Sequence, residues 1–458
     1  MKVPHPEIFK AYDIRGIVEQ SLTPEIVRQI GQAIGSEALE AGDSAVIVGR
    51  DGRLSGPDMV TALTEGITAA GCDAIDIGMV PTPLTYFATH HLGIGAAVSV
   101  TGSHNPPNYN GLKIMVGTHT LAGERIQGLK HRIEAQTVAH GAGQQSQEDV
   151  VPAYLRRVTE DIQLDRPLRV VSDCGNGVAG MLAPRLLREI GCEVIELFSE
   201  VDGHFPNHHP DPSVPENLED LIAAVHEHRA DLGLAFDGDG DRLGVVTNTG
   251  KVVWPDRQMI LFARDILSRH PGAEIIYDVK CTRLLPDAIA AAGGKPTMWK
   301  TGHSFIKAKL RESGAALGGE MSGHLFFKER WYGFDDALYA AARLCEVLAK
   351  TDDSADTVFS AIPDTVNTPE LKLEMNEGEH YELIAELVAA ADFPDGKICD
   401  IDGIRVDFDD GFGLARASNT TPTVVMRFEG ANECALKQIQ DAFRRQLIAL
   451  RPHLTLPF

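Results

Sequence analysis

The sequence predicts an α/β protein with three repeated βαβ-type domains, whose sheets are mixed but largely parallel, followed by a C-terminal α+β domain. Three observations support this prediction. A chain of 458 residues is too long for one hydrophobic core, so several domains with clefts between them are expected. A unit of alternating strands and helices recurs three times, and after about residue 365 the pattern changes.

Each repeat has the predicted order strand, helix, strand, helix, strand. The first begins at AVIVGRDGR near residue 46, continues through a helix from Pro57 to Ala70, and ends at AAVSVTGSHNP. The second runs from LRVVSDCGNG (168–177) to LGLAFDGDGDR, and the third from EIIYDVKCTR (274–283) to AALGGEMSGH. Short apolar strands that alternate with amphipathic helices indicate parallel βαβ crossovers with both faces of the sheet covered.

The C-terminal segment has a different pattern. A strand at LKLEM, a helix at YELIAELVAAA, a hairpin at ICDIDGIRVDF and a closing helix at ECALKQIQDAFRRQLIAL predict a smaller α+β domain. We expect boundaries in HGAGQQSQEDV, near Gly250, and in TDDSADTVFSAIPDTVNTPE. The expected domains are therefore 1–149, 150–250, 251–364 and 365–458.

Composition excludes several classes of function. The net charge of −23 repels polyanions, so nucleic acid is not expected as a partner, whereas a small anion can still bind where Lys, Arg and backbone N–H groups gather in a cleft. Seven cysteines without a C-x-x-C pair argue against a disulfide framework or a zinc site and favour a reducing cytoplasm. The chain has no apolar segment of the length that spans a membrane, so no membrane contact is expected.

Three polar loops follow the last strand of the three repeats, where ligands bind in α/β sheets: TGSHNP, DGDGDR and GEMSGH. In DGDGDR, glycines let Asp237, Asp239 and Asp241 converge, and three adjacent carboxylates favour a divalent cation. Hard oxygen ligands in small number suit Mg²⁺. A solvated hairpin turn is the alternative, and a calcium EF-hand fits poorly, because Arg242 and Asn248 occupy its glycine and glutamate positions.

Ser103, in the TGSHNP loop, has several possible roles. An acyl-transfer nucleophile is the weaker enzymatic interpretation, because the G-x-S-x-G motif is absent and the adjacent His104 is poorly placed as a base. A phosphoryl group on Ser103 would add a further ligand for the metal. A turn or helix cap is the structural alternative.

Together these motifs resemble the α-D-phosphohexomutases, specifically the bacterial phosphomannomutase/phosphoglucomutase type. TGSHNP, DGDGDR, GEMSGH and RASNTTP occur in that family's order, and the resemblance extends from YDIRG through FPNHHPDP, VKCT and KTGHSFIK. It implies four domains around a central cleft, a catalytic phosphoserine at Ser103, and Mg²⁺ bound by Ser103, Asp237, Asp239 and Asp241. In these terms 1–149 would be a phosphoserine-loop domain, 150–250 a metal-binding domain, 251–364 a sugar-recognition domain and 365–458 a C-terminal phosphate-binding domain. The phosphoserine would phosphorylate a hexose monophosphate to a bound hexose 1,6-bisphosphate, which turns over and returns its other phosphate.

This interpretation gives roles to further residues. Arg242 and Lys113 would neutralise the transferred phosphoryl group, and His104 would shape the loop. Glu320 and Ser322 would bind sugar hydroxyls, as the resemblance implies. RASNTTP would hold the phosphate that is not reacting, through Arg416, Ser418, Asn419, Thr420 and backbone N–H groups. Arg242 paired with the aspartates, a solvated Lys113 and a bland turn at RASNTTP are the structural alternatives.

His303 and His324 are the candidates for general acid and base, although histidines in loops are often only hydrogen-bonding residues. Tyr12, Arg15 and Lys280 resemble active-site positions of the family. His208 and His209 suggest metal ligands, but the surrounding prolines and the acidic site elsewhere favour a rigid loop. We expect a cytoplasmic, monomeric isomerase that acts on hexose phosphates, with the bisphosphate as activator. Gluco or manno preference stays open. The alternatives are a metal-dependent sugar-phosphate phosphatase and a non-catalytic sugar-phosphate binding protein.

Overall fold

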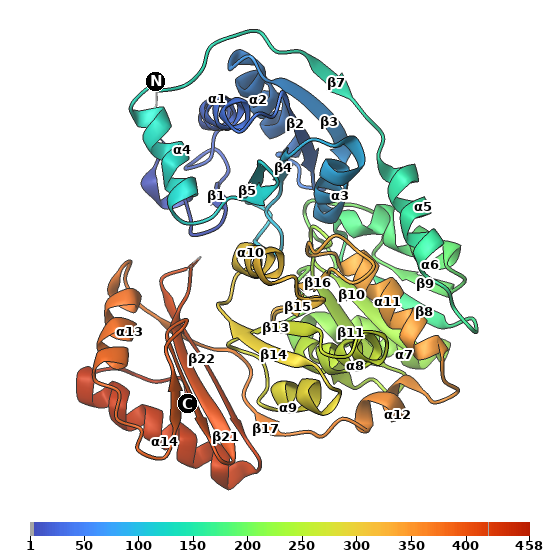
Figure 1. Cartoon of the computed structure of the whole chain (residues 1–458), viewed down its shortest axis with the longest axis vertical. Coiled ribbons are helices and arrows are strands. Elements are labelled where there is room, and N and C mark those ends of the chain that lie inside the picture. Colours follow the sequence, from blue (N-terminus) through green and yellow to red (C-terminus); the bar gives the residue numbers. More distant parts are fainter. Residues whose placement is uncertain (1–3, 420) are drawn as a thin grey trace.

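The computed structural model describes residues 4–419 and 421–458. Four sheets follow one another along the chain, and the units that contain them are arranged around the middle of the molecule (Figure 1). The predicted fold class is confirmed. We propose to divide the chain at 1–149, 150–250, 251–364 and 365–458, and we number the units in that order. Strand β12 pairs with β11 across Gly250, so the division at residue 250 passes through a hairpin turn.

The first unit contains a sheet in the order β1-β5-β4-β2-β3-β7, with β6 paired to β5. Its strands are β1 Ile14–Ile17, β2 Ala45–Arg50, β3 Asp73–Met79, β4 Ala96–Val100, β5 Tyr109–Val116, β6 His119–Thr120 and β7 Gln145–Gln147. Its helices are α1 Pro24–Glu40, α2 Gly56–Ala69, α3 Thr82–Leu92 and α4 Glu124–Glu134, with a 3₁₀ turn at Pro6–Ile8.

The second and third sheets have the orders β12-β11-β10-β8-β9 and β14-β13-β15-β16. The strands are β8 Arg169–Asp173, β9 Glu193–Leu197, β10 Leu232–Phe236, β11 Leu243–Thr247, β12 Val252–Val253, β13 Glu274–Asp278, β14 Lys295–Trp299, β15 Leu317–Gly319 and β16 Leu325–Phe327. The helices are α5 Val151–Asp161, α6 Ala183–Glu189, α7 Glu219–His228, α8 Pro255–Arg269, α9 Leu284–Ala291, α10 His303–Ser313, α11 Ala337–Ala349 and α12 Ala355–Ser360. Short 3₁₀ segments lie at Val178–Met181 and Pro215–Leu218.

The three repeats share one topology. In each, the first strand lies between the second and the third, all parallel, and an antiparallel strand follows on the far side of the third. The loops TGSHNP, DGDGDR and GEMSGH connect the third strand to this antiparallel neighbour: β4 to β5, β10 to β11, and β15 to β16. Loops of equal topology therefore reach the same side of their sheets, which places their polar residues at the cleft.

The C-terminal unit is an antiparallel sheet in the order β17-β22-β21-β20-β19, with β18 paired to β22. Its strands are β17 Val366–Asn367, β18 Leu371–Glu374, β19 Lys397–Cys399, β20 Ile404–Phe408, β21 Gly411–Ala417 and β22 Thr423–Gly430, and its helices are α13 Glu379–Ala389 and α14 Glu433–Leu450. The closing helix has the bounds predicted from the sequence. The sequence prediction missed the long β21–β22 hairpin, whose first strand contains the first two residues of RASNTTP.

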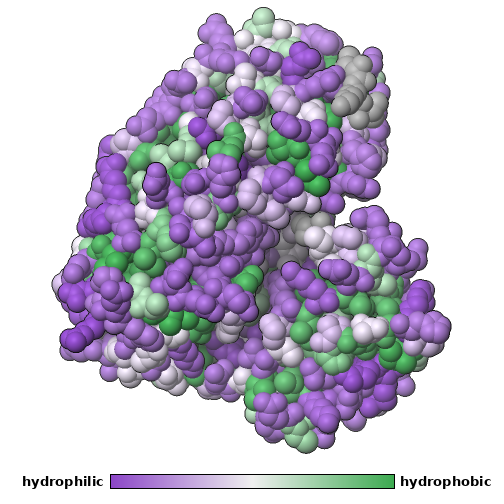
Figure 2. Space-filling model, turned by 180° about the vertical axis from the view of Figure 1, so that it is seen from behind, coloured by the Kyte–Doolittle hydropathy of each residue, from purple (hydrophilic) through white to green (hydrophobic). Residues whose placement is uncertain are grey.

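The units are joined in two ways. One buried hydrophobic core runs through the first three units, and the first and the C-terminal unit each have a further core of their own. The C-terminal unit is attached in part by the buried Arg405 and Arg427, which donate to backbone carbonyls at Val279, Lys280 and Cys281. It is also attached by a small apolar cluster, in which Val279 packs with Phe412 and Leu414. A deep notch with hydrophilic surroundings separates this unit from the rest (Figure 2). Among the described helices, none is long and apolar enough to cross a membrane.

Candidate active site

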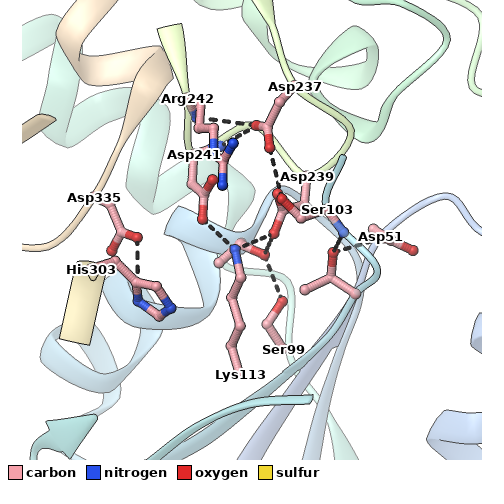
Figure 3. A network of polar contacts seen from close by, with 12 residues as sticks. Asp51, Ser99, Ser103, Lys113, Asp237, Asp239, Asp241, Arg242, His303 and Asp335 are labelled. Carbon is pink, nitrogen blue, oxygen red and sulfur yellow. Dashed lines mark hydrogen bonds and ion pairs between the residues drawn. The ribbon is translucent and has the colours of Figure 1, made fainter. Parts of the chain in front are cut away.

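Ser103 lies in the loop after β4 and is 1% exposed. It has a positive φ of 49°, which is uncommon for a residue other than glycine. Its Oγ lies 2.9 Å from Asp237 Oδ2 and 3.2 Å from His104 Nδ1. Because Asp237 follows β10 in the second unit, the loops of two repeats meet at this hydroxyl (Figure 3).

The Ser103 loop is held by two residues that the sequence analysis did not select, Asp51 and Arg53. The Asp51 carboxylate accepts from Thr101 Oγ1 and from the Gly102 N–H, and it lies 3.3 Å from Arg53 Nε. The buried guanidinium of Arg53 donates to four carbonyl oxygens of the loop, those of Ser103, Asn105, Pro106 and Tyr109. This pair therefore fixes the strained backbone around the serine.

Asp237, Asp239 and Asp241 converge as predicted, with one carboxylate oxygen of each within 4.8 Å of the others and none of the three residues exposed. The loop curls because Asp237 Oδ1 accepts from the backbone N–H groups of Asp241 and Arg242, at 3.0 and 3.1 Å. Asp239 Oδ2 accepts from Thr82 and Lys113. Its other oxygen is buried and has no hydrogen-bond partner in the described part of the chain.

The electrostatics of this cluster favour a cation. Burial, followed by the charges of Asp239 and Asp241, raises the pKa of Asp237 well above its ordinary value. Lys113 Nζ offsets part of the negative charge by bonding to both Asp239 and Asp241. Ionising all three buried carboxylates costs free energy unless a cation compensates their charge, and Asp239 has an oxygen without a hydrogen-bond partner. The three residues therefore form a donor set that fits a divalent cation with oxygen ligands.

The GEMSGH loop of the third unit meets the same cluster. His324 Nε2 lies 3.2 Å from Asp241 Oδ1, and His324 Nδ1 lies 2.9 Å from Glu320 Oε2. Burial opposes a charge on this imidazole, but the Asp241 and Glu320 carboxylates outweigh it and raise the pKa of His324 to about 9. Ser322 Oγ is also within 3.1 Å of the ring, and an isolated β-bridge joins Arg242 to His324.

Four further predicted residues lie around these loops. Arg15 donates from Nη1 to the Gly102 carbonyl at 2.6 Å, and Tyr12 packs edge-on against His303 at 5.0 Å. Burial, followed by the charges of Asp13 and Glu320, raises the pKa of Tyr12 to about 12, while Arg416 and Arg242 oppose the rise. Burial, followed by Arg242 and Arg15, holds the pKa of His104 well below its ordinary value. Tyr12 is thus near charges from all the other units.

The loop FPNHHPDP braces the site. His209 Nε2 bonds to the carbonyl oxygen of His104, and His208 Nε2 lies 3.0 Å from Asp173 Oδ2. Neither histidine belongs to a possible metal cluster among the described residues.

The predicted phosphate-binding motif RASNTTP is only partly a loop, because its first two residues lie in a strand. Arg416 is the second-last residue of strand β21, and its Nε donates to Asp402 Oδ2 at 2.9 Å. Its Nη2 is buried and has no hydrogen-bond partner in the described chain. Ser418 and Asn419 follow that strand, and Ser418 Oγ accepts from the Thr421 N–H at 3.3 Å, as in a turn. Thr420 lies outside the described residues. Lys280 is paired with Glu370 at 2.6 Å.

Four family models match the chain in order. They are phosphoglucomutase/phosphomannomutase alpha/beta/alpha domains I, II and III, at residues 6–139, 152–250 and 254–366, and the C-terminal domain at 370–446. The chain belongs to the phosphoglucomutase/phosphomannomutase family. The resemblance inferred from the motifs is confirmed.

Relatives of this family match nearly the whole chain. The phosphomannomutase/phosphoglucomutase of Pseudomonas aeruginosa is 54% identical over 451 residues, 98% of this chain and 97% of its own length. The phosphoglucomutase of Neisseria gonorrhoeae is 50% identical over 455 residues, 98% of both chains. The crystal structure of a phosphoglucomutase/phosphomannomutase family protein from Burkholderia thailandensis has a TM-score of 0.94, with 54% identity and 99% of each chain covered.

Proposed function

We propose that this protein is a phosphohexomutase that interconverts hexose 1-phosphate and hexose 6-phosphate, of mannose, glucose or both, through a phosphoserine at Ser103 and a bound hexose 1,6-bisphosphate. The observation that carries the proposal is the 2.9 Å contact between Ser103 Oγ and Asp237 within the acidic cluster. A phosphoryl donor and a cation site from separate units meet there, as phosphoryl transfer requires. Family membership and the named relatives support the same reaction.

Asp237, Asp239 and Asp241, together with a phosphoryl oxygen on Ser103, would hold Mg²⁺. The ion neutralises charge on the transferred phosphoryl group when it is bound, and Arg242 and Lys113 add positive charge from the protein. As the sugar hydroxyl oxygen bonds to phosphorus, one of the two candidate histidines, His303 or His324, takes the hydroxyl proton. The P–Oγ bond breaks, Ser103 Oγ keeps its electron pair, and the positive charges of Lys113 and Arg242 offset the negative charge left there until the return transfer. After the intermediate turns over, the reverse sequence returns the other phosphate to Ser103.

The intermediate must be held in two orientations. Glu320 and Ser322 would bind sugar hydroxyls, and the buried, unpartnered Nη2 of Arg416 supports a role in binding the distal phosphate with Ser418, Asn419 and Thr420. Tyr12 and Arg15 would line the site. Lys280 would bind phosphate only after its ion pair with Glu370 is broken. A sugar bisphosphate bridging Ser103 and Arg416 would thus span the cleft between the first and last units.

The proposal is tested with purified protein, Mg²⁺, a catalytic amount of hexose 1,6-bisphosphate, and mannose 1-phosphate or glucose 1-phosphate as substrate. Isomerised hexose 6-phosphate should accumulate without inorganic phosphate, and EDTA should stop turnover until excess Mg²⁺ is added. Release of inorganic phosphate alone would indicate a phosphatase instead.

Replacement Ser103→Ala should abolish turnover and remove the phosphoryl group that intact mass spectrometry should detect on part of the wild-type protein. The buried Ser99, 2.8 Å from Thr82 Oγ1, provides the control Ser99→Ala, which should keep the phosphoryl group. Full activity of Ser103→Ala would exclude Ser103 as the donor. Binding without turnover in the wild type would point to a sugar-phosphate binding protein.

A further inference from the structure

Thr82, the first residue of α3, contacts the acidic loop of the second unit and has no role in the reaction described above. It is completely buried. Its Oγ1 donates to Asp239 Oδ2 at 2.7 Å, and its backbone N–H donates to the Asp239 carbonyl at 2.9 Å. The first N–H groups of a helix have no partner within the helix, so the second bond uses a donor that α3 leaves free. Thr82 therefore holds Asp239 by both side chain and backbone, from a different unit.

The two carboxylate oxygens of Asp239 have different surroundings. Oδ2 accepts from Lys113 Nζ at 2.7 Å (Figure 3) and from Thr82 Oγ1 at the same distance. Oδ1 is also buried, but no hydrogen bond reaches it from the part of the chain that the structure describes. An ionised carboxylate can only accept, and a buried oxygen without a partner costs free energy. The two donors thus occupy one oxygen and leave the other for a cation.

We propose that Thr82 is a positioning residue of the metal site, whose hydroxyl holds Asp239 Oδ2 so that Oδ1 is directed at the divalent cation. This inference rests on the proposed function, in which Asp239 is a ligand of that cation. A hydroxyl has one proton and serves one acceptor, whereas Lys113 Nζ is shared between Asp239 and Asp241. Partners behind a metal ligand fix the orientation of that ligand, and their loss lowers metal affinity about 10- to 100-fold.

The substitution Thr82→Val tests the proposal, because it removes the hydroxyl but keeps the branched side chain and the backbone N–H. Mn²⁺ is the probe, since it takes the same oxygen ligands as Mg²⁺ and its free form is measured by EPR. The dissociation constant of Mn²⁺ should rise about 10- to 100-fold in Thr82→Val. Thr82→Ser keeps the donor, so its dissociation constant should stay within about threefold of the wild-type value. Intact mass spectrometry confirms that the compared proteins carry equal amounts of phosphoryl group.

The Mg²⁺ dependence of turnover separates positioning of a metal ligand from general damage to the active site. In Thr82→Val the Mg²⁺ concentration that gives half of the maximal rate should rise by the same factor as the Mn²⁺ dissociation constant. At saturating Mg²⁺, kcat should return to within about threefold of the wild-type value, because Asp239 itself is still present. A structural defect would instead lower kcat at every Mg²⁺ concentration.

Thr85→Val is the matched control. Thr85 lies three residues further along α3 and is equally buried, but its hydroxyl has no hydrogen-bond partner among the described residues. The same substitution there should leave the Mn²⁺ dissociation constant and the Mg²⁺ dependence unchanged.

Thr82→Ala also lacks the hydroxyl and must give the same loss of Mn²⁺ affinity, which keeps the test decisive if the valine variant does not fold. An unchanged Mn²⁺ dissociation constant in either folded variant would overturn the proposal. So would a Thr82→Ser protein that binds Mn²⁺ as weakly as Thr82→Val. Failure of the mutase function itself would appear differently, as a wild type that binds Mn²⁺ but does not isomerise hexose phosphates.

Discussion

The guanidinium of Arg416 donates a hydrogen bond from Nε to Asp402, whereas its buried Nη2 has no hydrogen-bond partner in the described chain. If Nη2 binds the distal phosphate, Arg416→Lys should raise KM for hexose phosphates about 10- to 100-fold, because a charge-assisted hydrogen bond is worth about 1.5–3 kcal/mol and lysine lacks the fork. Initial rates over a range of substrate concentrations test this. Arg125→Lys, at an exposed ion pair with Glu37, should change nothing, and an unchanged KM in Arg416→Lys would contradict the assigned role.

At the residue scale, the sequence identified side chains that sit in loops of unusual composition, such as Ser103 and Asp237, but not those whose roles depend on distant partners. Arg53 precedes the carbonyls that it binds by about 50 residues, and Thr82 lies 157 residues before Asp239. In the sequence, both look like ordinary polar residues. Burial and contact, which give them their roles, exist only after folding.

At the scale of loops and strands, the Ser103 and Asp237 loops touch through backbone at Gly238. A Cβ at this position would lie 2.4 Å from the carbonyl oxygen of Ser103, closer than any normal contact. Gly238→Ala should therefore push the acidic loop away from the serine and lower kcat at least about tenfold, as small displacements at reacting groups do. Steady-state kinetics and the Mg²⁺ dependence of the rate test this prediction.

Gly128→Ala is the matched control for Gly238→Ala, because Gly128 lies in α4 and a Cβ there meets nothing within 4 Å. It should leave kcat unchanged and stabilise the protein by roughly 0.5–1 kcal/mol. If Gly238→Ala retained full activity, the two loops would not need their observed separation.

The repeated elements were predictable because strand and helix alternate with glycine- and proline-rich turns at each end. The antiparallel strand that closes each repeat was not assigned, since Leu325–Phe327 spans only three residues and the polar motifs just before these strands suggested loops. RASNTTP was taken entirely as a loop, whereas Arg416 and Ala417 extend β21. Cross-strand pairing with β22 decides that boundary, and pairing over distance is weakly encoded in local sequence.

At the scale of the whole molecule, the number of units was predictable from length and repeats, but the way they are joined was not. The first three units share one apolar core that includes Tyr154, Trp331 and Leu338. The last unit is attached by buried arginines, whose partners are carbonyl oxygens and Asp256, and by the small apolar cluster of Val279, Phe412 and Leu414. Such attachments between residues far apart in the chain leave no periodic signal in the sequence. They imply that the last unit can unfold separately from the rest.

Arg427 makes this separation testable. It is 1% exposed and donates to the Lys280 carbonyl and, at 3.2 Å, to Asp256 Oδ2, which also accepts from the Thr282 N–H. Arg427→Met would take from the buried Asp256 its hydrogen-bonded cation and leave only Arg257 Nη1, 3.7 Å away, which costs up to about 3–5 kcal/mol. Differential scanning calorimetry should show a C-terminal transition at lower temperature, with the transition of the three-unit core unchanged.

Arg343→Met is the counterpart, because Arg343 is fully buried in α11 and pairs with Glu329 at 3.0 Å inside the three-unit core. It should lower the other transition and leave the C-terminal one in place. Limited proteolysis at a temperature between the two transitions should release fragments of residues 365–458 first from Arg427→Met. A single transition whose midpoint temperature falls in both variants would mean that the four units unfold together, and it would contradict the separate unfolding of the last unit.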